Sequence, residues 1–390
     1  MPPLATILMT ARNARRTIQR ATQSALEQGD YPFVLVDDFS SDDTVSACRA
    51  IAGDRLRVVR PPRHETLGLA RQTGLSAVDT RFAVWVDADD EMLPGRVTRL
   101  VNAMRTDCSQ IAADAVELMD GATGVRSGQL PMPPFLSGHH PAARLFERNY
   151  LPGTGCIGLE TESALRVGYD PALHGPEDID FILRSIVAGF RISFLDEVGY
   201  RLYAYPDSVS RQRDHQRRHY RAALLKHPYE SVRTIYRRAG QSARITVWGL
   251  VSVAVFREDW AAALSYLDEA AAAIADPLEV LESSGPCPRP EGWRLLFHRG
   301  TVLLLSDRVE AAARTLEDAE CVHASPEGAN NLGVAMARLG NTQRAAELFS
   351  RSLRVMPGFL DARLNIEGNV VGQVTTHPLR AIPNRSDYSR

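Results

Sequence analysis

The sequence is poor in lysine: Lys226 is the only one in 390 residues, so arginine carries almost all of the positive charge. The 45 basic residues are nearly balanced by 47 acidic residues, which gives a formal net charge of −2. A balanced chain exerts no general attraction on nucleic acid or on an anionic membrane. We therefore predict no nucleic-acid partner, and we interpret the arginine excess as composition rather than function.

Paired cysteines and long apolar runs are also missing. The five cysteines are odd in number, lie far apart and form no C-x-x-C pair: Cys48, Cys108, Cys156, Cys287 and Cys321. This spacing supports neither a disulfide framework nor a zinc site, and it fits a reducing compartment. The most apolar helical stretch, Ile245–Phe256, is shorter than the ~18 residues that a membrane span needs. The first residues also lack a signal-peptide pattern. We predict a cytoplasmic protein without a transmembrane segment.

The first half of the chain alternates short apolar runs with helical patterns. Strands are expected at Leu4–Met9, Phe33–Val36, Leu56–Val59 and Arg81–Val86, and helices at Ala14–Gln28, Ser41–Ala52 and Thr66–Ala77. This alternation predicts an α/β domain with a mostly parallel sheet, which binds ligands at the carboxyl ends of its strands. Those ends carry Thr10, Asp37-Asp38 and Asp87-Ala88-Asp89-Asp90. A long loop is expected over Gly121–Pro141, then a helix at Glu177–Ala188 and a strand at Arg191–Leu195.

The second half is predicted to be helical and repetitive. Trp293–Glu320 and Gly328–Met356 align in phase, with Gly300 and Gly333 at the same position of each unit. Thr246–Ile274 aligns more loosely. Small residues at matched positions would let the two helices of a hairpin approach closely. The last unit resembles a tetratricopeptide repeat (TPR), which predicts an all-α domain of TPR-like hairpins.

Three acidic clusters could carry chemistry. The strand Val84–Val86 delivers Asp87 and Asp89 to one point, where carboxylates of like charge need a cation. Oxygen ligands suit Mg²⁺ or Mn²⁺. Asp38 could accept hydrogen bonds from a base or a ribose. The third cluster is Glu177-Asp178. Each cluster also has a simpler interpretation. Asp87 and Asp89 could form an acidic turn after the strand, and the cluster around Asp38 could serve helix capping by Ser41 or Asp42. Glu177-Asp178 could offset a helix dipole.

Five motifs in order resemble a family 2 glycosyltransferase of the GT-A fold over about residues 4–211. They are Met9-Thr10-Ala11-Arg12-Asn13, the acidic run Asp37 to Asp42, Gly68-Leu69-Ala70-Arg71-Gln72-Thr73-Gly74, the D-x-D sequence Asp87 to Asp89, and Glu177-Asp178 with Arg184 after Val167-Gly168-Tyr169-Asp170.

The resemblance implies roles for these residues. Thr10, Asp38 and Arg71 would contact the nucleotide, Asp87 and Asp89 would hold Mn²⁺ or Mg²⁺ and the diphosphate, and Glu177 would bind substrate beside the catalytic base Asp178. Such a base removes a proton from the attacking acceptor hydroxyl. The metal-bound diphosphate leaves on the opposite side of the sugar, which predicts inversion at the anomeric carbon.

Some positions depart from the family pattern. Arg12 stands where Tyr is usual, Gln72 where Asn is usual, and Tyr205 where a His that helps to bind metal or phosphate is frequent. Arg211 is a candidate diphosphate ligand in place of that His, as are Ser208 and Ser210. The rest of the basic run 211–221 is expected to be a solvated helix face, and His139 and His140 are expected to be loop residues.

The expected organisation is a GT-A domain (1–212), a helical linker (213–244), a TPR-like domain (245–368) and a flexible tail (369–390). The donor would be a nucleotide sugar linked to UDP, GDP or dTDP, with UDP favoured. The acceptor stays open, with a peptide or protein as one candidate, and the helical domain is a candidate homodimer interface. The alternative is a non-catalytic scaffold that uses its repeats to bind proteins. A nucleotidyltransferase would need a phosphate loop rich in glycine and lysine, which Thr10–Arg16 does not provide.

Overall fold

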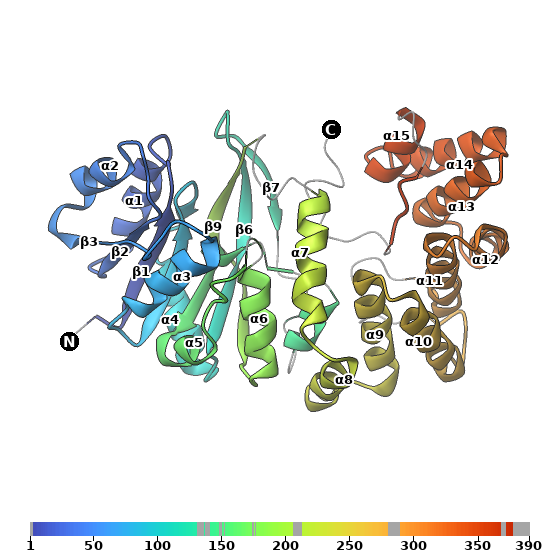
Figure 1. The fold of residues 1–390 in the computed structure, drawn as a ribbon, viewed down its shortest axis with the longest axis horizontal. Coiled ribbons are helices and arrows are strands. Elements are labelled where there is room, and N and C mark those ends of the chain that lie inside the picture. The colour runs from blue at the N-terminus through green and yellow to red at the C-terminus, as the bar shows by residue number, and fades with distance from the viewer. Residues whose placement is uncertain are drawn as a thin grey trace. The chain divides into compact units, whose positions relative to one another are not determined.

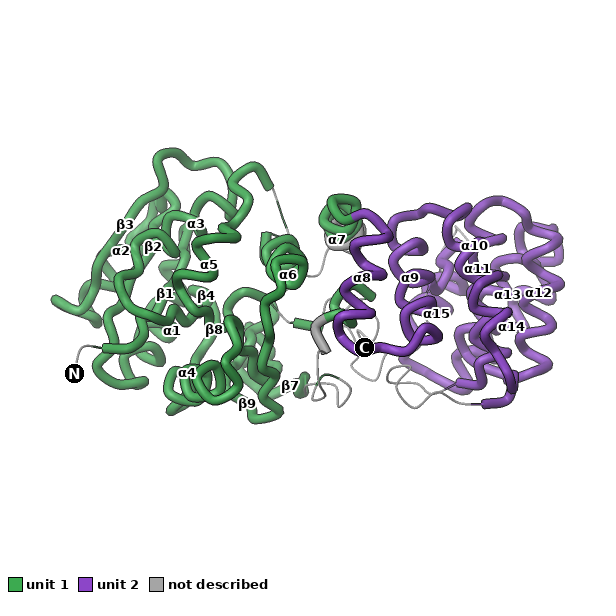
Figure 2. The backbone as a smooth tube through the Cα atoms, turned by 90° about the horizontal axis from the view of Figure 1, so that it is seen from below, with its two compact units in different colours: residues 1–227 green, residues 228–390 purple. Residues whose placement is uncertain are grey.

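The computed structural model describes residues 3–130, 136, 141–147, 150–151, 153–173, 175, 177–205, 213–279, 289–367 and 372–376. The chain forms two compact units, residues 1–227 and 228–390 (Figure 2). The first unit holds a nine-stranded sheet with helices, and the described residues of the second form helices without a strand (Figure 1). The predicted fold class, an α/β domain followed by a helical one, is confirmed. The finer domain limits at 212, 244 and 368 stay predictions.

One half of the sheet is parallel, as expected. Its order is β3-β2-β1-β4, and its strands are β1 (Ala5–Ala11), β2 (Phe33–Asp37), β3 (Leu56–Val59) and β4 (Phe82–Asp87). Strands β1, β2 and β4 are buried along almost their whole length, as is typical of parallel strands covered on both faces. The connecting helices are α1 (Ile18–Leu26), α2 (Thr44–Ala52) and α3 (Leu67–Ser76).

Helix α3 lies very close to the sheet because of Gly74. A Cβ atom at this position would lie 2.7 Å from Val36 Cγ2 and 3.1 Å from the Trp85 ring. Thr66 caps the helix by accepting a hydrogen bond from Leu69 N at 3.0 Å. The glycine therefore sets how near α3 can bring its side chains to the end of β4.

The other half of the sheet is mixed. Its strands are β5 (Glu91–Met92), β6 (Ile111–Asp120), β7 (Arg126–Leu130), β8 (Ile157–Glu160) and β9 (Ile192–Ala204). Strand β8 runs antiparallel to β4 and β6, whereas β6 and β9 are parallel to each other. The long loop expected over Gly121–Pro141 is wrong where β7 occurs. That strand is polar and largely exposed and pairs with β6, so it lacks the apolar alternation that marks a strand. The remaining helices of this unit are α4 (Arg96–Thr106), α5 (Thr161–Val167), α6 (Glu177–Val187) and α7 (Arg213–Leu225).

The second unit is a series of helical hairpins. Its helices are α8 (Tyr229–Arg238), α9 (Ala243–Arg257), α10 (Trp260–Ala273), α11 (Glu291–Leu305), α12 (Val309–Val322), α13 (Pro326–Arg338), α14 (Thr342–Val355) and α15 (Leu360–Glu367). The pairs α9–α10, α11–α12 and α13–α14 pack as neighbours. A Cβ at Gly300 would lie 2.6 Å from Leu316 Cγ, and one at Gly333 would lie 2.6 Å from the Phe349 ring. The close approach expected at these matched glycines is confirmed. The assignment of the hairpins to the TPR class stays a prediction.

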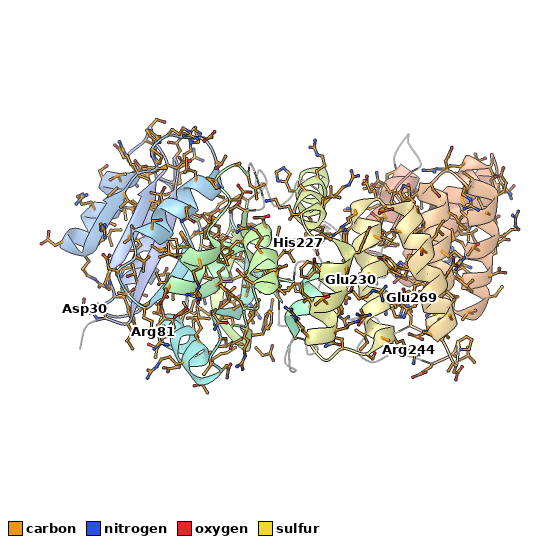
Figure 3. All side chains as sticks on the ribbon, turned by 60° about the horizontal axis from the view of Figure 1, so that its bottom comes forward. Asp30, Arg81, His227, Glu230, Arg244 and Glu269 are labelled. Carbon is orange, nitrogen blue, oxygen red and sulfur yellow. The ribbon has the colours of Figure 1, made fainter. Side chains whose placement is uncertain are left out.

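Ion pairs join the first hairpin to its neighbours. Arg244 on α9 donates to Glu291 at 2.7 Å and to Glu279 at 2.9 Å, and Arg233 on α8 makes two bonds of 2.9 Å to Glu269 on α10. Figure 3 labels Arg244 and Glu269 on the helices of this unit. None of the helices among the described residues combines the length and apolarity that crossing a membrane requires.

The Gly333 contact gives a test of the hairpin packing. Helix propensity alone would make Gly333→Ala stabilising by about 1 kcal/mol. We expect instead a loss of about 1 kcal/mol, because the added Cβ must displace the buried Phe349 ring. Chemical denaturation measures the difference. Ala272→Leu adds apolar bulk at an exposed position of α10 and should change stability by less than about 0.5 kcal/mol. Stabilisation by Gly333→Ala would contradict this packing.

Candidate functional site

The parallel strands bring the predicted polar residues together at one edge of the sheet. In the register of β1, Thr10 pairs with Val36 on one side and with Asp87 on the other. Asp38 follows β2, and its amide donates to Ala11 O at 2.9 Å. Thr10 and Asp38 are both buried. The strand ends singled out in the sequence therefore form one continuous polar edge.

The segment Ser41–Thr44, at the end of the acidic run that starts at Asp37, holds the turn that follows β1. Asn13 Oδ1 accepts a hydrogen bond from Ser41 N at 2.8 Å, Ala14 N donates to Thr44 Oγ1 at 2.7 Å, and Arg15 N donates to Asp42 Oδ2 at 3.2 Å. These contacts fix the chain beside Thr10. The helix-capping prediction for Ser41 or Asp42 is wrong in position, since α2 begins at Thr44 and its N-cap residue is Asp43.

The two neighbouring aspartates differ in their partners. Asp37 is fully buried and pairs with Arg60 at 2.7 Å. Asp38 Oδ2 lies 2.9 Å from His64 Nδ1, whereas its buried Oδ1 has no hydrogen-bond partner among the described residues. Buried acceptors of this kind normally have a partner, so Asp38 has an unused acceptor atom. No sequence motif marks His64, which lies outside the predicted site residues.

Arg71 joins two of the predicted clusters. Its Nη2 donates to Asp87 Oδ1 at 2.9 Å, its Nε donates to Glu177 Oε1 at 3.1 Å, and its side chain is only 5% exposed. The guanidinium carbon also lies 5.0 Å from the centre of the Trp85 ring. Arg71 Nη1 is buried without a partner among the described residues. Arg71, the predicted nucleotide contact, is therefore bound to two carboxylates and has one guanidinium nitrogen without a hydrogen-bond partner among the described residues.

Two tyrosines of β9 hold the turn that follows β4. The Tyr200 hydroxyl accepts from Asp87 N at 3.0 Å and donates to Asp90 Oδ2 at 2.9 Å, and Tyr203 N donates to Asp90 Oδ1 at 2.7 Å. Burial, together with the charges of Asp89 and Asp87, raises the pKa of Asp90 well above its ordinary value. Both oxygens of Asp90 are thus bound by the protein, and this residue positions the turn.

Asp89 is the carboxylate of this turn that suits a cation. It is half-buried, and burial together with the Asp87 charge raises its pKa to about 6. A divalent cation would relieve that repulsion. Mg²⁺ and similar cations bind through one or two carboxylates plus substrate phosphates, which Asp87 and Asp89 could supply. No group of three or more His, Cys, Asp or Glu side chains is arranged for a metal among the described residues.

The acidic pair at the start of α6 is held by its neighbours. Glu177 is buried against Arg71, and Asp178 is partly buried and accepts from Ile179 N at 2.7 Å. Burial raises the pKa of both, that of Glu177 to about 7. The single lysine, Lys226, lies 2.6 Å from Asp180 on this helix and 2.8 Å from Asp170 in the preceding segment. The only lysine of the chain, to which no role was assigned from the sequence, therefore ties α6 to the segment that precedes it.

The departures from the family pattern also have contacts. Gln72 Oε1 accepts from Tyr169 N at 2.8 Å, which ties α3 to the segment before α6. The Tyr205 hydroxyl accepts from Arg20 Nη2 at 3.2 Å, and the same nitrogen donates to Asp89 O. The predictions for His139, His140, Ser208, Ser210 and Arg211 lie outside the described residues, as do the side chains of residues 212–217 in the basic run.

Two further supporting residues, Arg96 and Arg20, carry no sequence motif. Arg96 is fully buried, pairs with Asp114 at 2.7 Å and donates to Trp85 O at 2.8 Å. Arg20 on α1 stacks on the Tyr203 ring at 3.5 Å. Their partners lie far away in the chain, so no local pattern could reveal them.

Comparison with known proteins fits this geometry. Residues 6–158 match the family model described as glycosyl transferase family 2. This part of the chain is therefore similar to family 2 glycosyltransferases. The match begins in β1 and ends in β8, and it therefore includes Thr10, Asp38, Arg71 and the D-x-D turn.

Two curated relatives are similar over the first part of the chain. The succinoglycan biosynthesis protein ExoO of Rhizobium meliloti (strain 1021) is 30% identical over 230 residues, which are 54% of this chain and 63% of ExoO. ExoU of the same strain is 29% identical over 246 residues, 59% of this chain and 68% of ExoU. The alignment with ExoO thus spans less than two thirds of that relative.

Solved structures resemble the chain more distantly. A fragment of S. aureus TarS shares 13% identity with a TM-score of 0.48, covering 91% of this chain and 92% of the fragment. The same fragment in complex with UDP-GlcNAc shares 14% identity with a TM-score of 0.48.

The raised pKa of Glu177 predicts a dependence of stability on pH. The folded state holds the Glu177 proton more tightly than the unfolded chain, so this group lowers stability as pH rises from about 4.5 to about 7. Glu177→Gln removes that loss. As pH rises from about 4.5 to about 7, we expect the free energy of unfolding of the variant to increase by on the order of 2 kcal/mol relative to that of the unmodified chain. Denaturant titrations at several pH values measure the difference. Glu162→Gln, at an exposed position of α5, should show no such trend, and a constant difference for Glu177→Gln would contradict the assignment.

Proposed function

We propose that this chain is an inverting, metal-dependent glycosyltransferase that moves a sugar from a nucleotide sugar to a nucleophilic acceptor. The observation that supports this most is the Arg71 bridge, because one buried guanidinium joins the D-x-D strand end to the acidic start of α6. Donor diphosphate chemistry and acceptor deprotonation would then occur at one place.

The donor would bind along the polar edge of the sheet. Asp38 Oδ1 supplies an unused acceptor for a base N–H or a ribose hydroxyl, and Thr10 lies between it and Asp87. A uracil base has a suitable N–H, and UDP-sugars are our first candidates. Asp87 and Asp89 would hold Mn²⁺ or Mg²⁺, which when bound neutralises charge on the departing diphosphate.

Asp178 would act as the base. A carboxylate whose pKa is raised by burial accepts a proton more readily near neutral pH. Glu177 would serve a different role, because its Oε1 is bound by Arg71 and it fixes the first turn of α6. A single base opposite the departing diphosphate gives inversion at the anomeric carbon.

The helical unit would serve recognition. We propose that its TPR-like hairpins contact the acceptor, a peptide or protein being the class that such surfaces suit. Assembly of a homodimer through these helices is a second proposed use.

A thermal-shift panel tests donor binding. UDP-, GDP-, dTDP- and CMP-sugars are compared with and without Mn²⁺, because a ligand that binds only the folded state raises Tm. One nucleotide should stabilise the chain only with Mn²⁺, and Asp89→Asn should abolish that effect. Glu162→Asn serves as an exposed acidic control and should leave it unchanged. If no nucleotide shifts Tm, the donor site is wrong.

Turnover of Asp178→Asn separates the enzyme from a non-catalytic scaffold. With the donor found above, the release of nucleoside diphosphate is measured as the sugar is transferred to water or to an acceptor. We expect kcat to fall at least about 100-fold, the usual scale for loss of a general base, while the metal-dependent Tm shift persists. An unmodified chain that binds the donor without any turnover would favour the scaffold.

A further inference from the structure

The helical unit contains a buried polar site, here called the asparagine groove, at which the segment 372–376 of the same unit binds. Three asparagines line it: Asn330 and Asn331 on α13 and Asn365 on α15. Two are fully buried and Asn365 is 3% exposed. The segment 372–376 runs along them, and all of these residues belong to the same compact unit. Buried carboxamides need hydrogen-bond partners, and here the partners come from a stretch of backbone.

The asparagines bind the main chain of the segment. Asn331 Nδ2 donates to Thr375 O at 2.7 Å, and its Oδ1 accepts from Thr375 N at 2.8 Å. One carboxamide thus binds both polar groups of one residue, as a neighbouring strand would.

The other two asparagines continue this pattern along the segment. Asn365 Oδ1 accepts from Gly372 N at 3.0 Å and from Gln373 N at 2.8 Å. Asn330 and Asn365 both donate to Gln373 O, at 2.8 and 3.0 Å. Every extended peptide offers the same groups, so this recognition depends little on sequence.

Two side chains of the segment add selectivity. Val374 packs against the apolar core formed by α11 to α14. The Thr375 hydroxyl donates to Asp361 Oδ2 at 2.8 Å. The Gln373 side chain is exposed. The groove therefore selects an apolar residue followed by a hydroxyl residue.

An empty groove would be unfavourable. Loss of the segment would leave Asn365 Oδ1 without a partner among the described residues, at about 1–3 kcal/mol. It would also remove half of the hydrogen bonds of Asn330 and Asn331, which keep those to each other, to Asn365 and to Thr301. The groove needs an occupant, and its requirements are those of an extended backbone.

We propose that this groove is a binding site for an extended segment of a partner protein carrying an apolar–Thr/Ser pair, and that residues 372–376 are its built-in competitor. A tethered competitor acts at a high effective concentration, so a partner must displace it. Releasing the tethered segment should then raise the apparent affinity for a peptide in proportion to the fraction of open groove. This proposal is independent of the transferase activity.

Thr375→Pro in the full-length chain tests the competition. Proline removes the N–H that Asn331 accepts, which frees the groove. The probe is a fluorescent peptide with the sequence of residues 370–378, and its Kd is measured by anisotropy. We expect binding at least tenfold tighter than to the unmodified chain. Thr376→Pro is the matched control, because the Thr376 amide donates to none of the described residues, and it should resemble the unmodified chain.

The peptide supplies a second test that leaves the protein unchanged. N-methylation at the nitrogen of its Val–Thr bond removes the donor to Asn331, and binding to the Thr375→Pro chain should weaken at least tenfold. Equal binding of both peptides, or no gain from Thr375→Pro, overturns the proposal. If Thr375→Pro does not fold, Val374→Asp is the second releasing variant. Loss of cooperative unfolding in both variants would make the segment part of the core and also overturn the proposal.

Discussion

The candidate site depends on one buried ionic interaction, that of Arg71 with Asp87 and Glu177. Two carboxylates on separate elements would repel each other in a buried place, and the guanidinium between them removes that repulsion. Breaking a buried ion pair by deleting one partner typically costs about 3–5 kcal/mol, because an uncompensated charge is left. The bridge therefore both holds the fold and brings the end of β4 to the start of α6.

The surrounding contacts make sense as support for this bridge. Gly74 lets α3 approach the sheet, so that Arg71 can reach Asp87. The Tyr200 hydroxyl accepts a hydrogen bond from the Asp87 amide and so holds the turn after β4. On the other side, Lys226 holds α6 through Asp180. The result is a rigid frame in which Asp38, Asp89 and Asp178 keep atoms available for ligands.

Sequence reasoning predicted those parts of this frame that lie next to each other in the chain. The strand ends at Thr10, Asp38 and Asp87 could be found because each follows an apolar run. Strand β7 was missed because its residues are polar, and the part of β9 beyond Leu195 because Asp196 and Glu197 interrupt its apolar pattern.

Contacts between residues far apart in the chain could not be predicted from the sequence, for a different reason. The partners of Arg20, Arg96 and Lys226 are set by tertiary packing and leave no local periodicity. The matched glycines Gly300 and Gly333 were predictable since the repeat itself displays them. The asparagine groove was not, because its occupant follows the last helix and shows no pattern of its own.

Calorimetric titration of Arg71→Lys with Mn²⁺ and the stabilising nucleotide sugar tests the bridge most directly. Lysine keeps the positive charge but cannot donate to Asp87 and Glu177 together with the fixed geometry of a guanidinium. If the bridge aligns the donor site, the variant should keep its cooperative fold and bind the donor at least tenfold more weakly. Unchanged affinity in a folded Arg71→Lys chain would contradict the account.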